Sequence, residues 1–146
     1  MSSHIADRDV ARLDRYDGEL RVTADIDDAR PFGVIRAWSV FEDAGAYDIQ
    51  ARVSAGGDGF HVRGFMDCDT SDAAVDVIRR EAGDDPRRVD WDATHHSKPT
   101  QILFTAKPSG EAEPWRSEPW RAVDDLLRRS SRFDALAYRV DGEWFG

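Results

Sequence analysis

The chain has 146 residues, a formal net charge of −9 at pH 7, 40% hydrophobic residues and a single cysteine, Cys68. This length and composition support one domain with a sizeable core, which excludes wholesale disorder, and a lone cysteine excludes an intrachain disulfide. The negative charge disfavours direct binding to nucleic acid phosphates and to anionic membrane surfaces, because both need a basic face.

The first ten residues include Asp7, Arg8 and Asp9 and lack the apolar core of a signal peptide. The most apolar run, residues 32–41, is much shorter than the roughly 20 residues of a membrane span and contains Arg36. We therefore expect a cytoplasmic protein that folds as a single domain over residues 1–146.

The first half of the chain predicts one helix and four strands. Apolar residues recur at helical spacing over residues 4–16, and beyond them the apolar period changes to two, which is typical of strands. The tract Gly56-Gly57-Asp58-Gly59 predicts a hairpin turn. The result is a predicted four-stranded antiparallel meander whose strands lie at residues 19–26, 32–41, 47–54 and 60–67.

The second half predicts two helices and two further strands. Asp69 or Thr70 is expected to cap a helix that ends at Gly83, followed by a polar loop at residues 84–98. Another helix is predicted at about residues 118–129, after a proline-rich loop at residues 107–119. The further strands are predicted at residues 100–106 and 135–140.

These elements predict the α+β class, with a mainly antiparallel sheet of five to six strands and two main helices on one face. One core is expected to hold the apolar residues that face inward from these elements. Its expected members are Leu20, Val22, Ile49, Val53, Val62, Met66, Val77, Phe104 and Leu127.

The acidic residues are unusual in kind and in distribution. There are 22 Asp against 7 Glu, and residues 1–73 hold 15 acids and 8 arginines, a net charge of −7. Asp25, Asp48 and Asp67 occupy outward positions of the predicted strands, where an acidic face would attract a basic protein. Trp and Arg are common in binding hot spots, so the partner-binding candidates are completed by Trp91, Trp115 and Arg116.

A second group of candidates would suit a small ligand. His61 and the cluster Asp92, His95 and His96 offer imidazoles and a carboxylate that can act as acids, bases or ligands. Adjacent histidines diverge and no metal-binding spacing is present, so we expect no metal and no cofactor. No catalytic residue is predicted.

The leading functional prediction is a non-enzymatic acidic protein that binds a basic partner protein, as inhibitors, immunity proteins and nucleic-acid mimics do. The first alternative is a small-molecule-binding domain or hydrolase-like enzyme with a pocket between sheet and helices. The second alternative is a homodimeric regulatory subunit.

Overall fold

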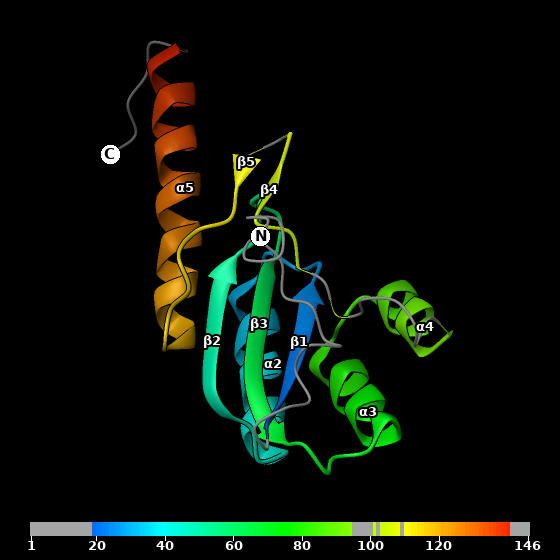
Figure 1. The fold of residues 1–146 in the computed structure, drawn as a ribbon. Helices are drawn as coiled ribbons and strands as arrows, with labels where there is room; N and C mark the ends of the chain where they lie inside the picture. The colour runs from blue at the N-terminus through cyan, green and yellow to red at the C-terminus, as the bar shows by residue number, and fades with distance from the viewer. Residues whose placement is uncertain (1–18, 95–100, 102, 109, 141–146) are drawn as a thin grey trace, which may run out of the picture.

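The computed structural model describes residues 19–94, 101, 103–108 and 110–140. Its centre is a three-stranded antiparallel sheet with the order β1-β3-β2 (Figure 1). The strands are β1 (Glu19–Ile26), β2 (Tyr47–Val53) and β3 (Phe60–Asp67). Strands β1 and β2 both run antiparallel to β3 and are joined by helix α2 (Pro31–Asp43), which makes a split β-α-β unit.

The predicted strand at residues 32–41 is wrong, and with it the four-stranded meander. The segment forms α2, which begins at Pro31, a residue suited to the first helical position because it lacks a backbone N–H. Its buried residues Val34, Ala37 and Phe41 recur at intervals of three and four, the helical period. This largely apolar run conceals that period, because the exposed positions Phe32 and Ile35 are apolar as well.

Helix α3 (Asp72–Ala82) begins one or two residues later than predicted. Its cap is Ser71, whose Oγ accepts a hydrogen bond from the N–H of Ala74 at 3.1 Å, and Asp69 and Thr70 precede the cap. The helix ends at Gly83 as predicted, with a φ of +91° that favours glycine. Helix α4 (Pro86–Thr94) occupies most of the stretch that was predicted to be a polar loop.

The last third of the chain contains less sheet than predicted. A two-stranded ribbon joins β4 (Ala106–Lys107) to β5 (Gly110–Glu111), and helix α5 (Pro119–Val140) includes the residues of the predicted last strand. The fold is α+β as predicted, but the main sheet has three strands, not five to six. The predicted helix at residues 4–16 lies outside the described residues. No helix in the described part of the chain is long and apolar enough to cross a membrane.

The core lies between α2 and one face of the sheet, with α3 beside β1 and α5 beside β2 (Figure 1). Six of the predicted core residues are buried: Leu20, Val22, Ile49, Val53, Val62 and Met66. The other three are exposed by about half, namely Val77 (52%), Phe104 (47%) and Leu127 (53%). Val77 was misplaced because α3 turns Val75, Ile78 and Ala82 inward.

The opposite face of the sheet is polar, yet part of it is covered by Trp115. Trp115 lies on this face, with the guanidinium carbons of Arg52 and Arg63 at 4.2 and 4.0 Å from its ring centre. As a result Arg52 and His61, whose strand positions predict solvent exposure, are only 5% and 3% exposed.

The outer edge of β1 is closed by side chains instead of a fourth strand. The Gln101 amide accepts a hydrogen bond from the N–H of Thr23 at 2.7 Å and donates to the carbonyl of Arg21 at 3.3 Å. Further along the edge, the carboxylate of Asp84 accepts from the N–H of Asp25 at 2.9 Å. These bonds satisfy backbone groups that an exposed edge would leave open to another chain.

The correction at α2 leads to a stability prediction. Phe41 is 0% exposed, so Phe41→Ala should lower the free energy of unfolding by about 3–5 kcal/mol through lost burial and a residual cavity. Phe32 is on the same helix and 68% exposed, so Phe32→Ala is the matched control, with an expected change within about 0.5 kcal/mol. Urea unfolding of both variants checks this, and equal losses would contradict the orientation of α2.

Candidate functional site

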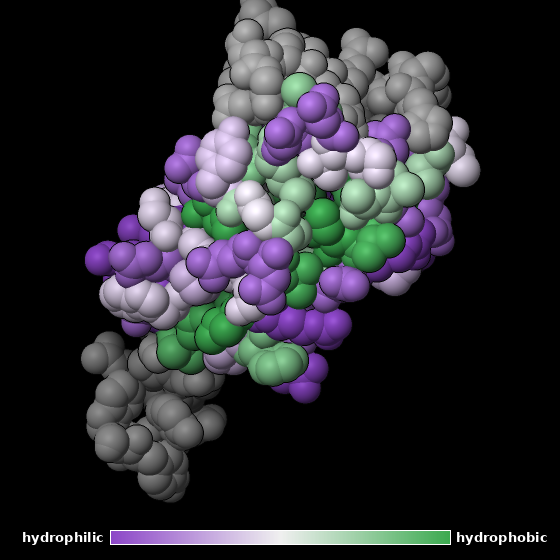
Figure 2. Space-filling view, turned by 90° about the horizontal axis from the view of Figure 1, so that it is seen from below, coloured by the Kyte–Doolittle hydropathy of each residue, from purple (hydrophilic) through white to green (hydrophobic). Residues whose placement is uncertain are grey.

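Six acidic residues gather at one end of the molecule. There α2 ends, β2 begins, β3 ends and α3 begins, which brings together residues 41–49 and 66–74 at the lower end of Figure 1. These two segments contain no lysine or arginine. We call this surface the acidic end, and its exposed acids are Glu42, Asp43, Asp48, Asp67, Asp69 and Asp72. Figure 2 looks onto it and shows hydrophilic residues beside an apolar patch.

Five of the six carboxylates of the acidic end differ from most others in their lack of ion pairs within the described part of the chain. Elsewhere, Asp76 lies 3.2 Å from Arg80, and Asp125 lies 2.7 Å from Arg116. Among the described residues no cationic side chain pairs with Glu42, Asp43, Asp48, Asp67 or Asp69. The acidic end therefore presents its charge outward.

Two of these acids oppose the stability of their own helix. Glu42 and Asp43 lie in the last turn of α2, which contains no basic residue. The C-terminal end of a helix carries a partial negative charge, and a carboxylate there is unfavourable by about 0.3–1 kcal/mol. The chain thus carries negative charge where the local structure favours lysine or arginine.

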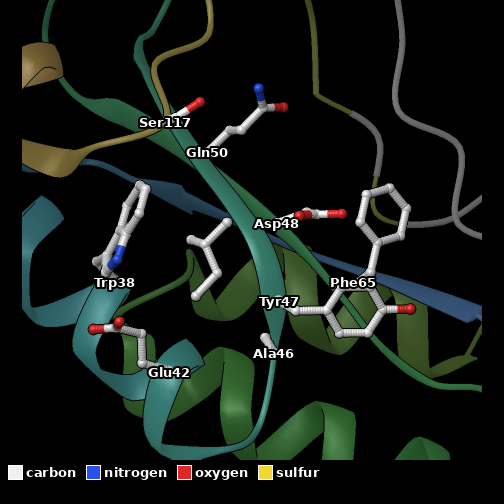
Figure 3. Close-up of a pocket in the computed structure, with 9 residues that line it drawn as sticks. Trp38, Glu42, Ala46, Tyr47, Asp48, Gln50, Phe65 and Ser117 are labelled. Atoms are coloured by element: carbon white, nitrogen blue, oxygen red, sulfur yellow. The ribbon is translucent and has the colours of Figure 1, made fainter.

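A pocket of about 600 Å³ opens beside β2 at the acidic end (Figure 3). Trp38 and Glu42, one helical turn apart on α2, form one wall. Tyr47, Asp48 and Phe65 form the other wall, on the far side of β2 in Figure 3. Each wall combines an aromatic ring with a carboxylate, and none of the described residues that line the pocket is basic.

The backbone is irregular where β2 borders this pocket. Asp48 has a φ of +51°, and the pairing of β2 with β3 shifts register between Tyr47 and Gln50. Aspartate adopts this left-handed conformation more readily than most residues, and such a bulge re-aims the side chains around it. The bulge therefore determines the position of the Asp48 carboxylate at the rim of the pocket.

The structure brings together two of the three strand acids that the sequence suggested for partner binding. Asp48 and Asp67 belong to the acidic end, whereas Asp25 lies opposite His61 in the sheet, toward the other end of β1. The sequence interpretation missed Glu42 and Asp43, because it assigned the run before them to a strand. The signal for them is the pair of acids that directly follows a helix-length apolar segment.

Asp25 and His61 form a separate polar pair. His61 Nε2 lies 3.8 Å from Asp25 Oδ1, and Arg52 Nε donates to His61 Nδ1 at 3.0 Å. Burial raises the pKa of Asp25 to about 6. Burial, assisted by the charge of Arg52, lowers the pKa of His61 to about 3. Near neutral pH the pair consists of a neutral imidazole and a carboxyl group that can gain or lose a proton.

The other residues suggested for partner binding have contacts within the fold. Trp115 stacks with two arginines of the sheet, as described above, and Arg116 donates two hydrogen bonds to Asp125, at 2.7 and 3.0 Å. Trp91 is 45% exposed on α4. None of the three lines the pocket at the acidic end.

The ligand candidates do not form one cluster among the described residues. Asp92 is buried and lies 2.9 Å from Arg79, and it also accepts the N–H of Gln101 at 2.9 Å. His95 and His96 lie outside the described residues. Asp92 therefore contributes to the packing of α4, and the other described candidate, His61, lies beside Asp25.

Asp67, Cys68 and Asp69 offer ligand atoms that all lie within 4.8 Å of one another. One carboxylate oxygen of Asp67 already accepts the N–H of Asp69 at 2.9 Å, as expected where a strand turns toward a helix cap. The trio adds negative charge to the acidic end.

Comparisons with protein families, curated proteins and solved structures find no match to this chain.

The Asp25 and His61 pair predicts an unusual dependence of stability on pH. The ordinary pKa values are 3.8 and 6.5, so between about pH 4 and 6 the folded state holds a proton on Asp25 and the unfolded state holds one on His61. The two contributions to the pH dependence cancel in the wild type. Asp25→Asn removes the contribution of Asp25 and keeps that of His61. The free energy of unfolding of this variant should therefore fall relative to wild type by up to about 1.4 kcal/mol per pH unit as the pH drops from 6 to 4.

His61→Gln is the counterpart, because it keeps only the contribution of Asp25, whose pKa is raised. Its stability relative to wild type should increase as the pH drops from 6 to 4. Urea unfolding at several pH values in this range measures all three proteins. Parallel curves for wild type and Asp25→Asn would contradict the assigned protonation states.

Proposed function

We propose that the protein is a non-enzymatic binding protein whose acidic end engages a basic partner protein. The observation that carries the proposal is the concentration of six exposed acids and no lysine or arginine in two segments that the fold brings together. The partner class is a basic protein, such as a nucleic-acid-binding enzyme that an inhibitor, immunity protein or nucleic-acid mimic would block.

The charge of the acidic end and the rigidity of its elements both favour binding of a basic protein. Clustered like charges raise the local concentration of an oppositely charged partner and increase its association rate, most strongly at low ionic strength. Glu42 and Asp43 oppose the helix dipole, and such a cost in stability is the expected trade-off when a surface serves binding. Short aspartate side chains on fixed elements also lose little entropy when a partner docks.

A small-molecule site is the second candidate, favoured by the pocket beside β2. Its volume of about 600 Å³ lies within the range of small-ligand sites. Its described lining residues include two carboxylates and no histidine, so it suits a cationic ligand better than acid–base chemistry.

Charge reversal outside the pocket tests the proposed function. Asp43→Lys/Asp69→Lys should slow association with the basic partner at least about tenfold at low salt, because it removes four units of attraction from the acidic end. The melting temperature should not fall, since a lysine at position 43 suits the end of α2. The partner is obtained by capture on the wild-type protein, and association rates are measured from low to high salt.

The matched control is Glu81→Lys/Glu111→Lys, which changes the net charge equally at two exposed acids outside the acidic end. It should retain most of the wild-type association rate. The proposal fails if every captured protein binds the reversed and control variants alike, or binds without dependence on salt.

A further inference from the structure

Resting on the proposed function, we infer that the pocket beside β2 receives arginine side chains from a basic segment of the partner, one at each wall. The acidic end supplies long-range attraction, and this pocket supplies the anchoring contacts. The two walls are the α2 wall, Trp38 with Glu42, and the β2 wall, Asp48 with Tyr47 and Phe65.

The chemistry of each wall matches a guanidinium group. A guanidinium is planar and weakly hydrated, so it stacks on aromatic rings while it donates paired hydrogen bonds to a carboxylate. Each wall offers both elements at once. An ammonium group is a compact, strongly hydrated charge, and the flat faces of the rings give it less contact. Arginine is therefore the preferred occupant over lysine.

The protein already makes contacts of this kind within its own fold. Arg52 and Arg63 stack on Trp115, and the guanidinium carbon of Arg121 lies 4.7 Å from the ring centre of Trp120. The described residues that line the pocket include aromatic rings and carboxylates and no arginine. On the β2 wall the guanidinium carbon of Arg21 lies 5.9 Å from the ring centre of Phe65, so this ring already makes such a contact within the fold.

The position of the pocket on β2 suits an extended segment. The chain pairs with the outer edge of β2 at Ala51, through Arg116, and then leaves toward α5. Ile49, two residues before Ala51 on β2, also lines the pocket. A segment crossing the edge of β2 at Ile49 would reach one wall with each of two side chains. The volume of the pocket also exceeds the need of a single guanidinium.

A pair of short peptides tests the inference without the natural partner. Acetyl-Gly-Arg-Gly-Arg-Gly-amide is titrated into the full chain, with the citrulline peptide as an uncharged isostere and the lysine peptide as a charged control. Backbone and indole N–H resonances are followed by NMR. The arginine peptide should produce saturable shifts at the indole of Trp38 and at the amides of Asp48 and Phe65, and bind at least about threefold more tightly than the lysine peptide. The citrulline peptide should produce no saturable shift.

Conservative variants assign the walls. Glu42→Gln should abolish the response of Trp38, and Asp48→Asn should abolish that of Phe65, each with a loss of affinity of about three- to tenfold. Asparagine also tolerates the left-handed backbone at position 48, so the fold should be retained. Glu81→Gln is the control and should bind as the wild type does.

Three outcomes would overturn the inference: equal binding of arginine and lysine peptides, shifts that ignore both wall variants, or tighter binding of spermidine, which would make the pocket a polyamine site. These outcomes differ from failure of the proposed function. A captured partner that still depends on Asp43 and Asp69, while the peptides ignore the pocket, would refute only the pocket inference.

Discussion

The arrangement of α3, α4 and β1 depends on one buried arginine. The guanidinium of Arg79 lies 2.7 Å from Asp84 and 2.9 Å from Asp92, and its side chain is 5% exposed. Asp84 also accepts a hydrogen bond from Arg88 at 2.7 Å. A buried charge that loses its partner costs several kcal/mol. Each of these charged groups can therefore be buried only because its oppositely charged partners are beside it. The network thereby holds both helices against the edge strand, and Asp25 acquires its partly buried setting from it.

The outer edges of β1 and β2 differ in how far they are covered, and this decides where another chain can approach. The edge of β1 is occupied by the amide of Gln101 and the carboxylate of Asp84. The edge of β2 is paired only in its second half, at Ala51 and Val53. Its first half carries the bulge at Asp48 and borders the pocket. The candidate site thus lies where the described chain leaves strand pairing incomplete.

Local patterns in the sequence predict part of this structure well. Alternation over β1, β2 and β3 and the glycines of the hairpin act over a few residues, so these elements could be predicted. Helix α4 could not, because its buried positions are Val89 and the polar Asp92, which give almost no apolar period. The burial of Thr23 could not either, because it depends on Gln101, 78 residues away. The same limit applies to the site: Asp67 follows from its strand, whereas Glu42 joins it only once the preceding run is known to be helical.

The two acidic segments also give the molecule an asymmetric charge distribution. Residues 41–49 and 66–74 lie at one end, and α5 runs from near that end toward the opposite one (Figure 1). A cationic protein in such a field experiences a torque as well as an attraction, so it is turned toward the same end before contact. Under the proposed function, a complex formed in this way would leave the far end of α5 pointing away from the junction.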